Sequence, residues 1–374
     1  MKKRSLVYPA WIILTIIFVI VALAFLLFFL YNYKTEKTAK GFEDEVYVVA
    51  DSVEYEQFVE SLRSVFEKEI NTPQPEKLFT LKRMSVAQFE KNQQAKNIII
   101  AAPLNSVSRT SDYIKVIVDK SIETKLESDS NFIDYKNDLW ARNQLVAVIS
   151  APTIDELNTK ILNNSDVLLN QFQKKSDERL FSNLYNPKYE KKNIEGKFLS
   201  DYGWVIYVQT DYMIALDNPV EKFVWLKKST SGDTEISIFI YWIEDGNTDY
   251  LVQDSIKAIR NRLTKKFYLT SDDTSYIVVA ENQFVVNEVN FNGKYALFTQ
   301  GLWNRELNGM EGPFVNYFFY DEMTQRIYMI DGSVYAPKYY NRNLIQQVDV
   351  TLQSFRTRSE LPKERIEELL DAID

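Results

Sequence analysis

The longest apolar stretch of the chain lies at its N-terminus. From Leu6 to Leu30 the sequence reads LVYPAWIILTIIFVIVALAFLLFFL and contains no charged side chain. About 20 apolar residues in a helix cross the roughly 30 Å hydrocarbon core of a bilayer. A cleavable signal has a shorter apolar region, about 7–15 residues, followed by a small-residue cleavage site, and no such site follows Leu30. We therefore predict an uncleaved transmembrane helix.

Basic residues flank this span on both sides, at positions 2–4 before it and at Lys34, Lys37 and Lys40 after it. The positive-inside rule favours an N-terminus in the cytoplasm, although the bias is small. We expect a single-pass protein of the inner (cytoplasmic) membrane. Residues 1–40 would be a cytoplasmic stub, the anchor and a linker, and the bulk of the chain would lie in the periplasm.

Strand and helix patterns alternate along residues 41–190. Asp51 and Glu54 have the spacing of a capping box, and the residues after them are apolar at helical intervals as far as Ile70. A second helical pattern begins at Thr153 and reaches about Tyr185. Runs rich in β-branched residues predict strands at 45–50, 78–82, 97–102, 113–119 and 144–150. The pattern predicts a first domain, 41–190, in which helices cover a sheet in α/β layers.

Strands dominate residues 191–374, after the charged run 188–197. Asn292-Gly293 between two apolar runs is the strongest short signal for a β-hairpin. Strands are predicted at 204–209, 212–216, 222–227, 235–242, 284–291, 294–303, 314–320 and 326–335, and helices at 249–266, 341–355 and 364–373. We predict a second domain, 191–374, formed by a mostly antiparallel sheet backed by helices, and an α+β fold class for the chain.

Composition removes many kinds of chemistry. The chain contains no His and no Cys, which excludes Ser-His-Asp triads, Cys nucleophiles, His or Cys zinc sites and disulfides. No phosphate-binding glycine loop of known type is present. We expect neither a cofactor nor a metal. Residues 41–374 carry 38 basic and 51 acidic side chains, a net charge of −13, and this charge disfavours nucleic acid as a partner.

Glycine is concentrated in one segment. Four of the ten glycines lie between positions 293 and 312, within NGKYALFTQGLWNRELNGMEGPF. Functional residues are often found on such loops between strands, and Trp303, Arg305, Glu306 and Glu311 lie beside these glycines. They are the candidate ligand or partner surface. The alternative is a β-bulge and a loop that joins two edge strands.

The same segment carries a family resemblance. GLWNRELNGMEGPFVNYFFYDE and RIYMIDGSVYAPKYYNRNLIQQVDVTLQSF resemble a family of bacterial envelope proteins known as domain of unknown function 4837. PEKLFTLKRMSVAQFEKNQQAKNIIIA, DLWARNQLVAVISAPTIDEL and EKFVWLKK extend the resemblance over nearly all of 41–355. Family members are usually lipoproteins, but this chain lacks the lipid-modified Cys. The second half is also similar to PsbP-like sandwiches, and the resemblance implies no reaction.

Two functions follow from these patterns. The first is a non-enzymatic binding or scaffolding protein of the cell envelope, with envelope proteins or cell-wall glycan as partners. The chain contains 23 Tyr and 23 Phe, and aromatic residues are enriched on surfaces that bury a partner, although packing of the core accounts for most of them. The alternative is a carboxylate-dependent hydrolase of cell-wall glycan, with Glu306 and Glu311 as the acid pair and Trp303 stacked on a sugar.

Overall fold

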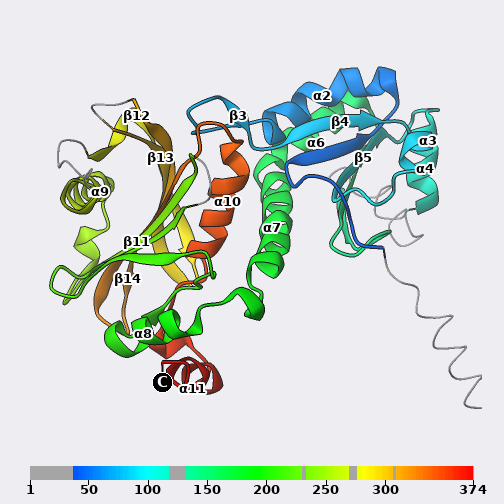
Figure 1. Cartoon of the computed structure of the whole chain (residues 1–374). Coiled ribbons are helices and arrows are strands. Elements are labelled where there is room, and N and C mark those ends of the chain that lie inside the picture. Colours follow the sequence, from blue (N-terminus) through cyan, green and yellow to red (C-terminus); the bar gives the residue numbers. More distant parts are fainter. Residues whose placement is uncertain (1–36, 118–131, 230–232, 269–275, 306–308, 374) are drawn as a thin grey trace, which may run out of the picture.

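The computed structural model describes residues 37–373 except 118–131, 230–232, 269–275 and 306–308 (Figure 1). The predicted membrane helix, Leu6–Leu30, lies outside the described residues. Within the described part of the chain, no helix has both the length and the apolar character that a membrane crossing requires.

The first sheet has five strands, four of them parallel. Its order is β4-β1-β5-β7-β6, and only the edge strand β6 runs antiparallel to its neighbour. The strands are β1 (Glu45–Val49), β4 (Thr80–Met84), β5 (Asn97–Pro103), β6 (Ile133–Asn137) and β7 (Leu145–Ala151). Every residue of β5 and β7 is buried, as expected for central parallel strands covered by helices on both faces.

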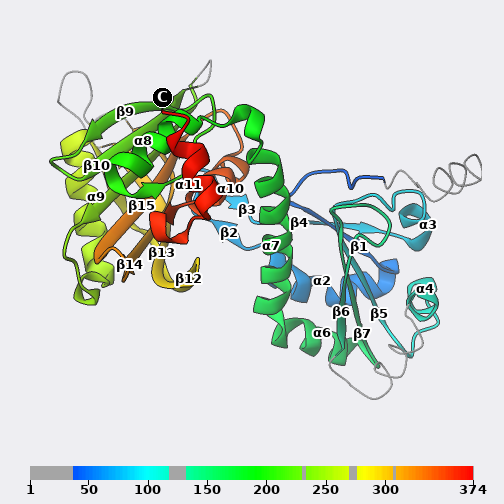
Figure 2. The ribbon, with the colours of Figure 1, turned by 90° about the horizontal axis from the view of Figure 1, so that it is seen from below.

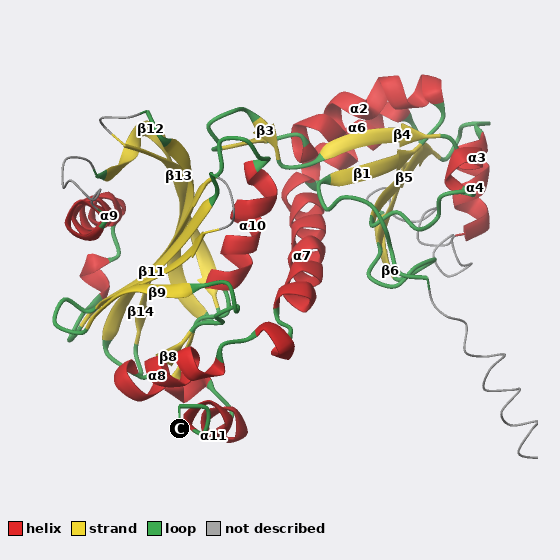
Figure 3. Cartoon of the chain, viewed as in Figure 1, coloured by secondary structure: helices red, strands yellow, loops and turns green. Residues whose placement is uncertain are grey.

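Helices cover both faces of this sheet (Figure 3). One face packs against α2 (Ser52–Phe66), α6 (Ile154–Asn163) and α7 (Ser165–Leu184). The other packs against α3 (Val86–Phe89) and α4 (Arg109–Ile117). A short hairpin, β2 (Glu69–Ile70) and β3 (Glu76–Lys77), projects from this layer toward the second half of the chain. The α/β layering predicted for this half is present.

Several local predictions for this half need correction. The described part of the segment 113–119, residues 113–117, is helix and not strand, because α4 covers Arg109–Ile117. In a strand, Ile114 and Val116 would face the same side of the sheet. Ile114 is fully buried whereas Val116 is 82% exposed. The helical region that begins after Thr153 is interrupted at Asn164, so that α6 and α7 are separate helices.

The capping predictions have mixed outcomes. Asp51 caps α2 as expected, but Glu54 accepts hydrogen bonds from Ser106 and Ser108 instead of closing the box. Ile70 belongs to β2 and not to the helix, which ends at Phe66.

The second sheet has seven strands and is antiparallel throughout, in the order β12-β13-β14-β15-β11-β10-β9. Its strands are β9 (Met213–Asn218), β10 (Phe223–Ser229), β11 (Glu235–Ile243), β12 (Ile277–Phe291), β13 (Lys294–Arg305), β14 (Glu311–Asp321) and β15 (Arg326–Tyr335). Asn292 and Gly293 join β12 to β13 with φ of 53° and 87°, the left-handed values that a two-residue turn of this kind requires. The predicted hairpin is confirmed.

The two faces of this sheet have separate cores. On one face, α8 (Lys192–Tyr202) and α10 (Asn341–Leu352) pack on a core that contains Trp204, Trp242 and Phe355. On the other, α9 (Gln253–Phe267) packs on a core around Phe239 and Phe318. The remaining short elements are η1 (Pro187–Tyr189), η2 (Thr248–Tyr250), η3 (Arg358–Glu360), α11 (Lys363–Leu370) and the pair β8 (Trp204–Val205) with β16 (Arg356–Thr357).

The fold is therefore α+β with a large antiparallel sheet, as predicted. One strand is much shorter than expected, since β8 covers only Trp204–Val205 of the predicted 204–209. Seen from below, α7 runs between the two sheets, beside α10 (Figure 2).

Candidate functional site

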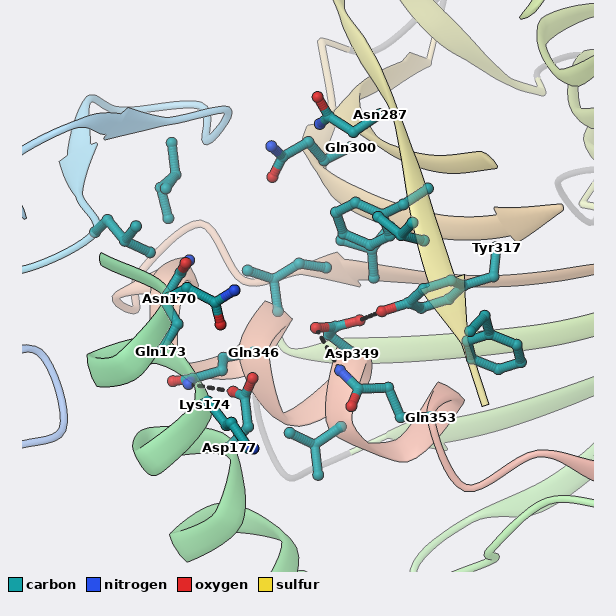
Figure 4. Close-up of a pocket in the computed structure, with 18 of the residues that line it drawn as sticks. Asn170, Gln173, Lys174, Asp177, Asn287, Gln300, Tyr317, Gln346, Asp349 and Gln353 are labelled. Carbon is teal, nitrogen blue, oxygen red and sulfur yellow. Dashed lines mark hydrogen bonds between the residues drawn. The ribbon is translucent and has the colours of Figure 1, made fainter. Parts of the chain in front are cut away.

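A cleft of ≈ 950 Å³ lies where α7, α10 and strands β12–β14 meet (Figure 4). Small-molecule sites commonly occupy about 300–1,000 Å³ and occur preferentially between domains. We call it the central cleft: α7 forms one wall, the sheet forms the other, and α10 forms the floor.

The α7 wall is a polar stripe. Its lining residues recur at intervals of three and four, which places them on one side of the helix: Asn170, Gln173, Lys174, Asp177, Glu178 and Phe181. The opposite side of α7 is buried against the first sheet through Leu168 and Phe172. One helix thus separates the first core from the cleft.

A buried arginine fixes the position of α7. The Arg179 guanidinium donates to the Glu43 carboxylate at 2.8 Å, to the Asn97 side-chain oxygen at 2.9 Å and to the Asn143 carbonyl at 2.6 Å. Burial by itself would raise the pKa of Glu43, but the charge of Arg179 and hydrogen bonds from Lys96 and Arg179 hold it below its ordinary value. An ionised Glu43 therefore holds the helix against the first sheet.

The sheet wall carries amides among apolar and aromatic side chains. Asn287, Phe298 and Tyr317 lie side by side across β12, β13 and β14, and the neighbouring row contains Gln300 beside Val315. Asn287 and Gln300 share the face whose other side chains pack against α10. Asn287 is exposed on the edge strand β12, Gln300 is half-buried on β13, and both line the cleft.

The floor is a hydrogen-bonded network on α10. The Gln346 amide donates to the Asp177 carboxyl at 2.8 Å and to the Ser176 hydroxyl at 3.0 Å. Asp349 accepts from the Tyr317 hydroxyl at 2.8 Å through one oxygen and from the Gln353 amide at 3.1 Å through the other. Figure 4 shows both networks at the base of the cleft.

Two carboxyl groups of this network hold protons unusually strongly. Burial and the nearby charge of Asp177 raise the pKa of Asp349 to about 7, against the lowering effect of its two hydrogen bonds. Burial raises the pKa of Asp177 to about 6, although Gln346 and Arg342 lower it. Each group can therefore be neutral or charged near physiological pH, so the cleft changes its charge in this range.

Direct contacts between the two halves fix the shape of the cleft. Glu76, on the β3 hairpin, accepts hydrogen bonds from the first backbone amides of α10. The Arg342 guanidinium donates to the Leu78 carbonyl at 3.0 Å, and the Tyr185 hydroxyl donates to the Val350 carbonyl at 3.1 Å. Walls held in this way make the cleft preorganised.

The structure places the sequence-predicted surface away from this cleft lining. Trp303 is only 3% exposed and packs in the core beneath α9, beside Tyr335. Arg305 ends β13, where its side chain contacts the Met310 sulfur at 3.5 Å, and Glu311 begins β14 and is exposed. Glu306 lies outside the described residues. The surface stays a prediction for Arg305 and Glu311, whereas the burial of Trp303 favours a core role.

Two of the four glycines of that segment serve strand packing. Gly301 and Gly312 lie inside β13 and β14, so the chain at these two positions is sheet and not loop. A Cβ at Gly312 would stand 2.0 Å from the Val334 carbonyl oxygen and 2.9 Å from the Trp303 ring. Glycine is needed there because the backbone of β14 lies against Trp303 and Val334.

The residues that line the central cleft were not among the sequence candidates. A signal was present in the polar stripe of 170–178 along one side of a helix and in Gln300, a half-buried amide on the sheet face that packs against α10. In the described part of the chain, no three acidic side chains converge as a metal site would require. The available chemistry is hydrogen bonding by amides, two carboxyl groups and aromatic rings.

Comparison with solved structures gives weak likenesses. The Ran-binding protein Mog1p of Saccharomyces cerevisiae matches with 11% identity and a TM-score of 0.29, over 42% of this chain and 90% of its own. A protein of Bacteroides thetaiotaomicron matches with 9% identity and a TM-score of 0.26, over 43% of this chain and 47% of its own. Scores this low carry no argument about fold or function. No curated protein matches the chain.

Family models match both halves of the chain. Residues 39–185 match a domain of unknown function, DUF8532. The resemblance to DUF4837 therefore does not extend over nearly all of 41–355 as expected, because the first half matches a different model. Residues 190–354 match the model of the domain of unknown function DUF4837, the family that the sequence resemblance predicted.

Proposed function

We propose that this protein is a membrane-anchored, periplasmic binding protein whose ligand occupies the central cleft. One observation carries the proposal: side-chain amides from α7 and from the second sheet line the same ≈ 950 Å³ space, one set from each family segment. Binding sites between two units of a chain commonly draw polar groups from both. The role is non-enzymatic, and its place is the cell envelope.

A carboxylate-dependent hydrolase is the second candidate, because Asp177 and Asp349 both line the cleft. Glycan hydrolysis requires one protonated carboxyl and one ionised carboxylate with different environments. Here burial raises the pKa of both groups. Moreover, the two oxygens of Asp349 already accept hydrogen bonds from Tyr317 and Gln353. These contacts favour binding over hydrolysis.

Thermal-shift measurements on the full chain in detergent test the binding role. Fractions of a small-molecule extract from the envelope are added to the wild type, to Gln300→Trp, which fills the cleft, and to Tyr295→Trp. Tyr295 lies on the same strand but is 52% exposed and is not part of the lining. We expect a fraction that stabilises the wild type and Tyr295→Trp but not Gln300→Trp. Equal stabilisation of all three, or none from any fraction, would overturn the proposal.

The membrane anchor has a separate test. The apolar span Leu6–Leu30 and its flanking charges support it. We expect the intact mass of the membrane-extracted protein to include this span. A mature chain that starts near residues 30–40 would rule the anchor out.

A further inference from the structure

We infer that the ligand of the central cleft is a neutral oligosaccharide, bound through its hydroxyl groups and the apolar faces of its rings. This inference rests on the proposed binding function and names the chemical class of the ligand.

Amides are the most numerous polar side chains of the lining. Nine of the 26 described residues that line the cleft are Asn or Gln, so uncharged groups that both donate and accept outnumber the five charged ones. An amide offers two N–H donors and a carbonyl acceptor, which suits a hydroxyl that also donates and accepts. A ligand rich in hydroxyl groups can use both capacities.

Four of these amides are available to a ligand. Asn170 and Gln173 on α7 lie across the cleft from Asn287 and Gln300 on the sheet (Figure 4). Among the described residues, none of the four side chains has a hydrogen-bond partner within the protein. Opposed amides of this kind can bind both edges of one sugar chain.

The charged groups of the lining disfavour an ionic ligand. The Arg342 guanidinium donates to the Leu78 carbonyl and, at 2.6 Å, to the Gln346 side-chain oxygen, and its remaining nitrogen, Nη2, is buried without a partner among the described residues and out of reach of a ligand. It is therefore a structural group, and Lys174 is the other cation of the lining. Asp177 and Asp349 would repel an anion when ionised, so an acidic ligand is disfavoured.

A cationic ligand is disfavoured by the same network. Its attraction to Asp349 would compete with the hydrogen bonds that Tyr317 and Gln353 donate to both carboxyl oxygens. The Gln346 amide likewise occupies an oxygen of Asp177. Near neutral pH the Asp349 carboxyl is partly protonated, and a neutral ligand does not require its charge.

Aromatic rings complete the lining. Phe298 is partly exposed and packs against Tyr317 with 4.9 Å between ring centroids, and Phe181 on α7 is 47% exposed. The apolar face of a sugar ring packs well against such rings, while its hydroxyl groups remain at the edge. The cleft, at ≈ 950 Å³, lies at the upper end of the range for small ligands. A chain of several sugars fits this volume better than a monosaccharide.

Calorimetric titration of the full chain in detergent tests the inference. The probes are the tetrasaccharides of glucose in β-1,4 and α-1,4 linkage and of N-acetylglucosamine, with spermine, an oligogalacturonate and a neutral tetrapeptide as comparison ligands. We expect at least one neutral tetrasaccharide to bind. Gln300→Ala and Asn287→Ala should each weaken this binding about threefold to tenfold, the loss of one hydrogen bond.

Asn304→Ala is the matched control, because Asn304 is exposed on the same strand, β13, and is not part of the lining. Its affinity should equal that of the wild type, and melting temperatures should show that all variants fold. Binding of spermine, the oligogalacturonate or the peptide alone would overturn the inference and leave the binding function intact. The same holds if no probe binds while an envelope fraction still stabilises the wild type but not Gln300→Trp. If no fraction does so, the proposed function itself fails.

Discussion

The carboxylate of Glu76 caps the helix that begins at Asn341 in the other half of the chain. It accepts the backbone N–H of Arg342 at 2.6 Å and that of Asn341 at 2.9 Å. The first amides of a helix have no partner within the helix, and a negative charge is favourable at this end. Glu76 is only 7% exposed. A residue from the first half thus satisfies the N-terminus of α10, the floor of the cleft.

We expect Glu76→Ala to lower the free energy of unfolding by about 1–3 kcal/mol, because two buried amides would lose their acceptor. Glu76→Gln should lose less, since one carbonyl acceptor remains. Chemical denaturation followed by circular dichroism measures the change. Glu69→Ala on the same hairpin is the control, because Glu69 is exposed. A loss from Glu76→Ala no larger than that of this control would mean that the cap contributes little.

Asp349 should make stability depend on pH. Its pKa is raised to about 7, mainly by burial, so the folded chain holds a proton that the unfolded chain releases nearer pH 4. The stability from this group is fully present below pH 4 and is lost as pH rises through about 7. The rise of about three pKa units, at about 1.36 kcal/mol each, corresponds to a loss of about 4 kcal/mol.

We expect Asp349→Asn to reduce the fall in melting temperature between pH 5 and pH 8. A residual slope should remain, because Asp177 and Glu195 have pKa values raised to about 6 and about 8. Asp166→Asn, an exposed carboxyl on α7, should keep the slope of the wild type. Identical slopes for Asp349→Asn and the wild type would contradict the prediction.

A buried ion pair lies beneath α9. The Arg260 guanidinium donates to Asp331 at 2.8 Å and 3.3 Å and lies 3.9 Å from the Phe314 ring centre. Asp331→Leu should cost about 3–5 kcal/mol, because a buried cation would lose its partner. The double variant Arg260→Met with Asp331→Leu should recover most of this loss. Lys338→Ala breaks an exposed pair and should not change the melting temperature measurably. A double variant no more stable than Asp331→Leu would refute this account.

For the surface predicted from the sequence, we expect Trp303 to behave differently from Arg305 and Glu311. Trp303→Ala should cost about 3–5 kcal/mol, because its ring is buried in the core beneath α9. Arg305→Ala and Glu311→Ala should leave the melting temperature near that of the wild type. If that surface binds a partner, these two variants should lose it in a pull-down from detergent-solubilised envelope. A stable Trp303→Ala protein would show that the ring is dispensable to the core.

The division into two domains is tested by limited proteolysis. The sequence predicts a boundary near residues 186–200, after which the helix-and-strand pattern gives way to strands. We expect the first cut there, and two fragments that stay associated through Glu76, Gln346 and Tyr185. Fragments that arise only from loops deep in either half, with 186–200 protected, would refute the division.

Local patterns determined much of the architecture. Asn292-Gly293 specified its hairpin because only residues that tolerate positive φ fit a two-residue turn. Ser85 and Gln88, which have the sequence spacing of a capping box, form one at the start of α3, since that interaction spans a single turn. The strand predicted at 113–119 was wrong because a short apolar run is compatible with either a strand or a helix. The described residues of this segment are helical, and Ile114 packs against the sheet.

Only the tertiary structure determines where the central cleft lies and which residues line it. Its walls come from segments around Asn170, Gln300 and Asp349, and no short-range rule brings such distant segments together. The raised pKa of Asp349 likewise follows from burial and the proximity of Asp177, which only the packing of α10 against α7 creates. The sequence determined the absence of His and Cys and most strands and helices, and it alone predicts the anchor, because these depend on composition and neighbouring residues. The cleft exists because α7 of the first half lies beside α10 and the sheet of the second half. Contacts between the halves, such as Glu76 with the start of α10, hold them in this arrangement.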